Sequence, residues 1–369
     1  MMYRWNCRTI TVALLAIYAL VSLVWLRYRT EGWWIPRTTH AVVTDNLLDV
    51  QNATCFPPAD SIVQFQKIFA MGFKERTDKH DAIALAASYT GLDVEWLEGV
   101  RAADIPPKAL PAPAELGSWR AHMNALRHIV ENKITSAVIM EDDSDWDVNI
   151  KAQMLELARG TRALQDTRGV PLSPYGDDWD LLWLGHCGIK SRGEPKFYVI
   201  ANDTTVTPRA HQNEFVRPAL AEDPNFEKHR LVFLADGAIC SWSLAFTYDG
   251  ARKALTALSY VGIDEPVDLG YNFLCTNILH VPYRCLSTFP SLLGTWAQRG
   301  PASRDSDITD GDKTWHEASS RSLTYSTMLN LLPLANTQTT IHAQWDDVPA
   351  PEIDLASFEI PPGYLYTPA

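Results

Sequence analysis

Short apolar runs alternate with amphipathic segments along the chain, a pattern typical of α/β proteins. Residues 68–73 predict a first strand, a helix rich in alanine and leucine follows up to Tyr89, and residues 92–97 predict a second strand. Gly91 is suited to cap that helix, because glycine readily adopts the left-handed conformation in which many helices end. The order strand, helix, strand predicts a βαβ unit with two parallel strands.

The alternation continues after a proline-rich loop. A helix is predicted over residues 114–131, because its apolar residues recur at helical spacing: Leu116, Trp119, Met123, Leu126 and Val130. Further strands are predicted at residues 137–140, 179–185 and 240–246, and another helix begins near residue 249. Residues 186–230 are polar and irregular, which predicts a long loop region. The fold class is therefore α/β, with a mostly parallel, Rossmann-like sheet flanked by helices.

Three consecutive carboxylates, Glu141, Asp142 and Asp143, follow the apolar strand 137–140. In an open α/β sheet, ligands bind at the carboxyl ends of the strands. Adjacent carboxylates repel one another, so they need a partner cation or water. A hard cation, Mn²⁺ or Mg²⁺, is held by one or two carboxylates together with substrate phosphates, which predicts a nucleotide-diphosphate site. A solvated acidic turn that ends a strand is the alternative interpretation.

This acidic stretch looks like the DxD-type motif of glycosyltransferases with the GT-A fold. The helix before it narrows the resemblance to glycosyltransferase family 25, which includes the lipopolysaccharide-biosynthesis and collagen galactosyltransferases. The family pattern there is Gly-Cys, followed after a few residues by Ser-His. This chain keeps Gly117 and His122, and it has Ser118 and Ala121 at the other two positions.

Other segments of the chain extend the resemblance to about residues 64–308. Residues 75–79 resemble a basic-Pro-Asp-basic turn of the family, without the proline. The other matching segments are 179–185, 249–255, 266–268 and 303–308. Residues 186–230 are unmatched, and residues 311–369 carry no motif that we recognise. No internal repeat is evident.

The resemblance implies a GT-A-like fold and a metal-dependent, inverting transfer of a sugar, with UDP-galactose as the commonest donor of the family. Mn²⁺ or Mg²⁺ would be held by Asp143 and Glu141, and Asp142 would contact the nucleotide sugar or the metal. The acceptor would be a hydroxyl of a glycan or glycoprotein. A catalytically inactive membrane-anchored protein that binds glycans or partners is the alternative, favoured by the changes at Ser118 and Ala121. A metal-dependent hydrolase fits less well, because the ten histidines are scattered without ligand spacing.

The resemblance also implies roles for three residues outside the acidic stretch. Arg76 would bind the donor, although a charged helix start is the simpler interpretation. His122 would line the donor pocket, although a histidine beside an apolar helix stripe is usually a core-edge residue. Asp268 would be the general base, because metal-bound carboxylates are poor bases; helix capping is its alternative, and Asp264 and Glu265 are nearby rivals.

The N-terminal part of the chain predicts attachment to a membrane. Residues 9–26 carry no charge and approach the length of a membrane-spanning helix. A signal peptide is the rival interpretation, but no small-x-small cleavage site follows. We expect a cytosolic tail at 1–8, a signal anchor at 9–26, a stem at 27–60, a GT-A domain at 61–310 and a C-terminal extension at 311–369. The protein would then be a single-pass type II protein of the Golgi or ER membrane.

Composition agrees with a lumenal catalytic body. An apolar content of 46% supports a sizeable core, and a net charge of -12 argues against a nucleic-acid partner. Two sequons, at Asn52 and Asn202, suit a lumenal location. Cys7 lies on the cytosolic side of the anchor, which leaves five cysteines in the body, so at least one stays free or pairs between chains.

Overall fold

The computed structural model describes residues 65–105, 113–167, 169–193, 196–212, 214–260, 265–307 and 313–368. They belong to a unit that spans Cys55–Ala369. The predicted anchor at 9–26, the stem, Asn52 and Cys55 lie outside these residues. None of the helices in the described ranges is long and apolar enough to cross a membrane.

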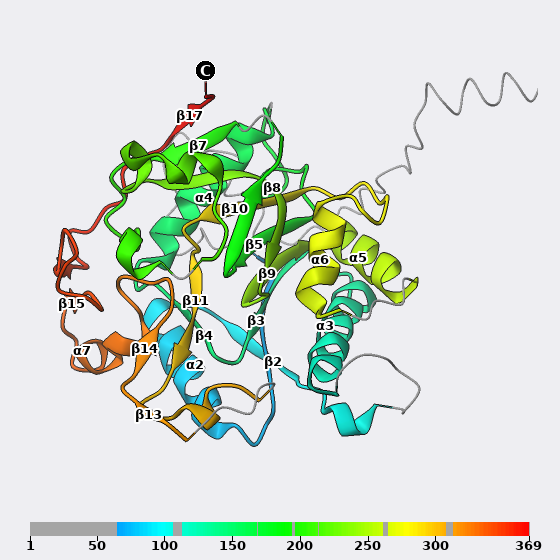
Figure 1. The fold of residues 1–369 in the computed structure, drawn as a ribbon, viewed down its shortest axis with the longest axis horizontal. Coiled ribbons are helices and arrows are strands. Elements are labelled where there is room, and N and C mark those ends of the chain that lie inside the picture. The colour runs from blue at the N-terminus through cyan, green and yellow to red at the C-terminus, as the bar shows by residue number, and fades with distance from the viewer. Residues whose placement is uncertain are drawn as a thin grey trace, which may run out of the picture. The chain divides into compact units, whose positions relative to one another are not determined.

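A ten-stranded mixed sheet runs through this unit (Figure 1). Its order is β17 (Tyr364–Tyr366), β7 (Phe197–Ile200), β8 (Arg230–Ile239), β10 (Cys285–Phe289), β5 (Leu181–Gly185), β9 (Ser243–Thr247), β3 (Ser136–Glu141), β1 (Lys67–Gly72) and β2 (Val94–Glu98), and β6 (Gly188–Ser191) pairs with β8. Strands β8, β9 and β17 run opposite to the others. The fold is thus α/β, with a central sheet in which most strands share one direction, which is compatible with a Rossmann-like fold.

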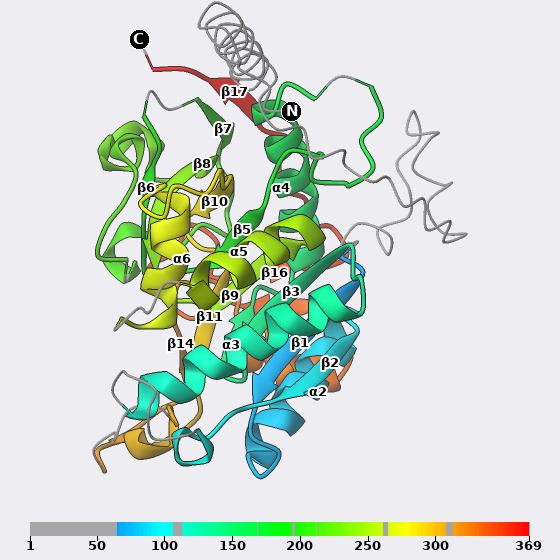
Figure 2. The same cartoon turned by 90° about the vertical axis from the view of Figure 1, so that its right-hand side faces the viewer.

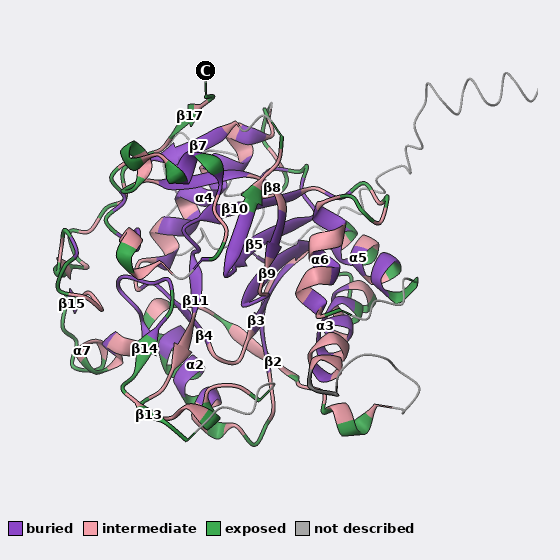
Figure 3. Ribbon diagram, viewed as in Figure 1, coloured by how far each residue is buried: buried purple, intermediate pink, exposed green. Residues whose placement is uncertain are grey.

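Helices cover both faces of the sheet (Figures 1 and 2). One face packs against α3 (Pro113–Glu131), α5 (Tyr248–Tyr260) and α6 (Val267–Cys275). The other face packs against α2 (Thr77–Thr90) and α4 (Ile150–Leu164). Each face has its own hydrophobic cluster, and the central strands between them are buried along most of their length (Figure 3).

The predicted βαβ unit is confirmed. Strands β1 and β2 are parallel, and α2 connects them. Gly91 caps α2 at φ 65°, and its N–H donates to the carbonyl of Ala87. Strand β3 pairs in parallel with the other side of β1, so β2, β1 and β3 end at one edge of the sheet.

The sheet is less regular than the pattern predicts, because antiparallel β9 lies between the parallel strands β3 and β5. An apolar run indicates burial of a strand but carries no information about its direction. The prediction of a long loop over residues 186–230 was wrong in part, because β6 and β7 lie within it. Both are only four residues long, so their pairing with β8 leaves a weak pattern in the sequence.

Residues 313–368, which the sequence predicts as an extension, are built into the same unit. Strand β17 pairs with β7 in the central sheet. A smaller sheet joins β14 (Ser319–Ser320), β11 (Leu293–Ala297) and β4 (Ser144–Trp146). The strands outside these two sheets are β12 (Gly300–Pro301), β13 (Trp315–His316), β15 (Thr340–His342) and β16 (Glu352–Asp354). The last α-helix of the chain is α7 (Leu331–Ala335).

Two disulfides join four of the five cysteines in the body. They are Cys187–Cys240 and Cys275–Cys285. The remaining one, Cys55, lies outside the described residues. The sequon residue Asn202 is exposed in the turn after β7, so it is accessible to a modifying enzyme.

Candidate functional site

The acidic turn lies at the carboxyl end of β3, as predicted. Glu141 is the last residue of β3, and Asp142 and Asp143 form the turn into β4. The backbone of the turn is held from two sides. The Glu141 N–H donates to the Trp242 carbonyl at 3.1 Å, and the Trp296 N–H donates to the Asp143 carbonyl at 2.7 Å. The three carboxylates are therefore fixed at the edge where β1, β2 and β3 end.

A buried lysine supplies a partner cation for these acids. Lys79 lies in the first turn of α2 and is 5% exposed. Its Nζ donates to Asp142 Oδ1 at 2.5 Å and lies 3.7 Å from Asp307 Oδ2. Burial opposes the charge on Lys79, but Asp143 and Asp142 outweigh that effect and raise its pKa. Lys79 is therefore charged at neutral pH.

Arg76 lies next to this lysine and is engaged with protein groups. Its Nε and Nη2 donate to the Asp78 carboxylate at 3.1 and 3.0 Å, and its Nη1 donates to Asp307 at 2.5 Å. Its Nη2 also donates to the Arg304 carbonyl at 2.8 Å. Arg76 therefore joins the β1–α2 loop to the segment around Asp307. These contacts fit a structural helix start as well as they fit a donor-binding residue.

Burial raises the pKa values of the acidic turn. Desolvation by the surrounding protein raises the pKa of Glu141 to about 8, and the nearby Asp143 adds to the rise. Burial raises the pKa of Asp143 to about 6, although the positive charges of Lys79 and Arg321 oppose the rise. The pKa of Asp142 is also raised by burial, against the opposing effect of Lys79. The surrounding protein therefore favours the protonated forms of these carboxyls more than water does, and Lys79 opposes that effect.

The carboxylates differ in how many of their oxygens are already bonded. Ser241 Oγ donates to Glu141 Oε1 at 3.2 Å, and Lys79 occupies Asp142 Oδ1. Asp143 Oδ1 is buried and has no hydrogen-bond partner among the described residues. A buried acceptor without a partner is costly and points to a group that binds there.

The carboxyl groups of the acidic turn could hold a hard divalent cation only if a bound substrate and water supplied the other ligands of the metal. No group of three or more His, Cys, Asp or Glu side chains converges on a metal position within the described ranges. Mg²⁺ and similar ions are often bound by one or two carboxylates, with substrate phosphates and water as the other ligands. Asp143 and Glu141 fit that pattern, because both offer oxygen atoms and Asp143 Oδ1 is unpartnered.

A short loop, residues 240–242, connects the acidic turn to Asp268. Asp268 lies in the first turn of α6, and its Oδ2 accepts the N–H of Cys240 at 2.8 Å. Its Oδ1 accepts the N–H of Leu269 at 2.9 Å. The next loop residue, Ser241, binds Glu141, so the predicted base lies on the same edge as the acidic turn. Both oxygens accept backbone N–H groups, which is also what a helix-capping carboxylate does.

His122 has a different environment from the acids. It is 1% exposed, and its Nδ1 lies 3.3 Å from the Tyr271 hydroxyl. Burial lowers the pKa of His122 to about 4, so the ring is neutral. Among the described residues, its Nε2 has no hydrogen-bond partner, and the ring makes no hydrogen bond with Glu141, Asp142 or Asp143. These features fit the alternative of a core-edge histidine between α3 and α6.

Four side chains of the site were not predicted: Lys79, Ser241, Asp307 and Arg321. Lys79 belongs to the charged turn at 75–79, so the resemblance already pointed to its segment. The other three are far from residue 141 in the sequence, and only the folded chain brings them to it. Asp307 lies in the segment 303–308 that carries part of the resemblance.

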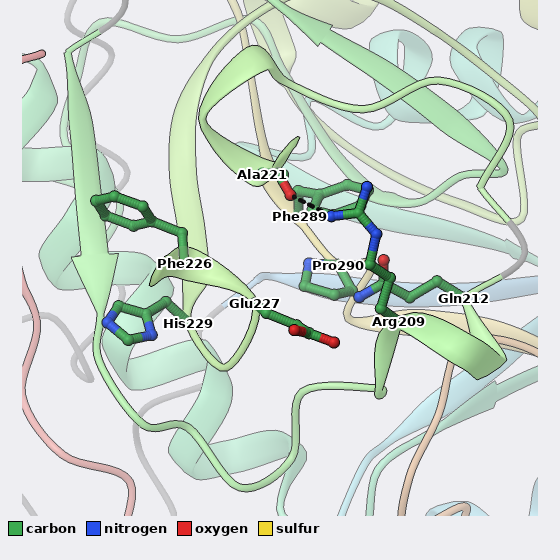
Figure 4. A pocket seen from close by; sticks show the side chains of 8 residues that line it. All are labelled: Arg209, Gln212, Ala221, Phe226, Glu227, His229, Phe289 and Pro290. Carbon is green, nitrogen blue, oxygen red and sulfur yellow. Dashed lines mark hydrogen bonds between the residues drawn. The ribbon is translucent and has the colours of Figure 1, made fainter. Parts of the chain in front are cut away.

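A small pocket lies elsewhere in the structure (Figure 4). The side chains of Arg209 and Phe226 line it, and a guanidinium N–H of Arg209 donates to the Ala221 carbonyl at 3.5 Å. None of the residues predicted for the functional site lines this pocket, and we assign it no role.

Comparisons with known proteins leave the family unassigned. No protein-family model matches the chain, and no curated protein sequence matches it. A crystal structure of mannose-1-phosphate geranyltransferase from Thermus thermophilus is similar over 60% of this chain and 72% of its own, with 11% identity and a TM-score of 0.26. A similarity at that TM-score carries no argument about fold or function. The chain is thus an α/β protein with a half-buried acidic turn at the carboxyl end of a parallel strand.

Proposed function

We propose that this protein is a metal-dependent glycosyltransferase that moves a sugar from a nucleotide diphosphate to a hydroxyl of a glycan or glycoprotein. One observation carries the proposal: Asp143 and Glu141 lie half-buried at the edge where α/β sheets bind ligands, and the buried Oδ1 of Asp143 has no hydrogen-bond partner among the described residues. Buried acids with raised pKa values are candidates for functional sites. The motif's resemblance to the DxD type adds the class of substrate.

In this proposal Asp143 and Glu141 hold Mn²⁺ or Mg²⁺. The bound ion would neutralise the charge that develops on the leaving diphosphate. Lys79 donates to Asp142 Oδ1 and holds that carboxyl group in place, so that Asp142 can face the ribose or the metal. Asp268 takes the proton of the acceptor hydroxyl, and inversion follows when the acceptor attacks opposite the leaving group.

The same proposal includes a GT-A-like fold, UDP-galactose as donor, and a lumenal body anchored in the Golgi or ER membrane through residues 9–26. Two features support the location. The body contains two disulfides, which persist in oxidising compartments. Its sequon residue Asn202 is exposed.

The alternative is a protein that binds glycans or partners without catalysis. It is favoured by three hydrogen bonds: Lys79 donates to Asp142, and each oxygen of Asp268 accepts a backbone N–H. The departures from the family pattern at Ser118 and Ala121 point the same way.

A donor screen separates the two functions. The purified protein is incubated with Mn²⁺ and UDP-galactose or other nucleotide sugars, and release of the nucleotide diphosphate is measured. We expect release to depend on Mn²⁺, to stop in chelator, and to be lost in Asp143→Ala. Asp249→Ala is the matched control, because Asp249 is an exposed acid in the first turn of α5. Metal binding without turnover of any donor would favour the binding protein, and full activity of Asp143→Ala would refute the metal site.

A further inference from the structure

The segment 313–368, which carries no recognised motif, brings a cation to the acidic turn. The Arg321 N–H donates to the Thr295 carbonyl at 2.9 Å on one side of β11. On the other side of β11, Thr295 pairs with Ser144, the residue after Asp143. Arg321 therefore lies one strand away from the acidic turn, across β11.

A glycine makes this approach possible. A Cβ atom at Gly294 would lie 1.8 Å from the Arg321 carbonyl oxygen, which no side chain could tolerate. Gly294 itself pairs with Asp145. The backbone of Arg321 is thus seated against β11 beside the acidic turn, and its position follows from the fold rather than from a loose surface loop.

The positively charged side chains near the acidic turn differ in whether they already have hydrogen-bond partners. Lys79 is bonded to Asp142, and Arg76 is bonded to Asp78, Asp307 and a carbonyl group. Arg321 is exposed, and its guanidinium makes no hydrogen bond or ion pair with the described residues. Its charge nevertheless acts on Asp143. Among the described residues, the guanidinium N–H donors of Arg321 therefore have no partner.

We propose that Arg321 binds the diphosphate of the donor, beside the cation held by Asp143 and Glu141. A guanidinium presents a planar set of N–H donors that matches phosphate oxygens, and it stays charged at all relevant pH values. The ligand class is a pyrophosphate group linked to a nucleoside. This inference rests on the proposed function, because it assigns the anion that the acidic turn receives together with its metal ion.

Binding of inorganic pyrophosphate tests the proposal without knowledge of the base or the sugar. Calorimetry compares the full-length protein with Arg321→Ala, Arg321→Lys and Arg252→Ala, each with and without Mn²⁺. Arg252 is an exposed arginine on α5 that pairs with Asp249, so its removal changes the net charge equally. We expect Arg321→Ala to bind pyrophosphate roughly 10-fold to 100-fold more weakly in Mn²⁺, as for a lost charge-assisted hydrogen bond. Arg321→Lys should lose less, and Arg252→Ala should bind as the unchanged protein does.

Two outcomes would overturn the inference in different ways. If Arg321→Ala keeps its pyrophosphate affinity while Asp143→Ala loses it, Arg321 only offsets the acidic charge and the proposed function stands. A lower melting temperature of metal-free Arg321→Ala would accompany that result. If the unchanged protein shows no Mn²⁺-dependent binding of pyrophosphate, the proposed function fails, and the site assigned to Arg321 fails with it.

Discussion

Replacing Lys79 with methionine should destabilise the protein strongly at neutral pH. The Lys79 and Asp142 side chains are only 6% and 12% exposed, and their charged atoms are 2.5 Å apart. Removal of one partner from a buried ion pair leaves an uncompensated charge, which typically costs about 3–5 kcal/mol. For a domain of this size, that loss lowers the melting temperature by roughly 5–15 °C.

The loss should depend on pH in a defined direction. Lys79 opposes the rise in the pKa of Asp142, so its removal raises that pKa further. A carboxyl whose folded-state pKa lies above its unfolded value stabilises the fold at low pH, and this contribution is lost as the pH rises through the folded-state pKa. The stability gap between the two proteins should therefore be small near pH 4 and should widen towards pH 8.

The assay is thermal and chemical unfolding in chelator, so that no metal ion replaces the lysine charge. Lys196→Met is the control, because Lys196 pairs with Asp166 at 2.9 Å with side chains that are 37% and 77% exposed. An exposed pair of this kind contributes about 0–1 kcal/mol. The reasoning is refuted if Lys79→Met loses no more stability than Lys196→Met, or if its loss is the same at pH 4 and pH 8.

Three further predictions concern the acids and the sequon. Because the pKa values of Glu141 and Asp143 are raised to about 8 and 6, protons compete with Mn²⁺ for these carboxyls. The affinity for Mn²⁺ should therefore rise from pH 6 to pH 8, and binding should release protons. Calorimetry in buffers of different ionisation enthalpy measures that release, and binding without it would contradict the prediction. Asp268→Asn should lower turnover roughly 10²–10⁴-fold and leave nucleotide affinity nearly unchanged, whereas preserved turnover with a lower melting temperature would identify Asp268 as a helix cap. Asn202 should carry a glycan in a eukaryotic host, so glycosidase treatment should increase the gel mobility of the native protein more than that of Asn202→Gln; equal shifts would show that Asn202 is unmodified.

The local part of the fold was predictable because it depends on neighbouring residues. The βαβ unit, the Gly91 cap and the position of the acidic turn all follow from apolar periodicity and from the properties of single residue types. The interior position of β9 did not follow, because β3 and β5 could equally have been neighbours. Strand order depends on pairings between residues that are far apart in the sequence.

The acidic residues of the site could be predicted from the sequence, whereas most of its positively charged residues could not. A strand with three acids at its end predicts a need for positive charge, but the pattern does not say which residue supplies it. Lys79 is 63 residues away from Asp142 in the sequence, and Arg321 reaches the turn only through β11. Asp268 illustrates the limit most clearly, since a carboxylate at a helix start has the same sequence pattern whether it caps the helix or takes a proton.

The hydrogen bonds of Asp145 tie the acidic turn to the last part of the chain. Asp145 is fully buried two residues after Asp143, and it accepts hydrogen bonds from Ser320, Ser326 and the Met328 N–H. All three donors come from the segment that lies beyond the recognised motifs. A truncated protein that ended near residue 310 would therefore keep every recognised motif and still leave this buried carboxylate with one of its four donors, the Trp146 N–H.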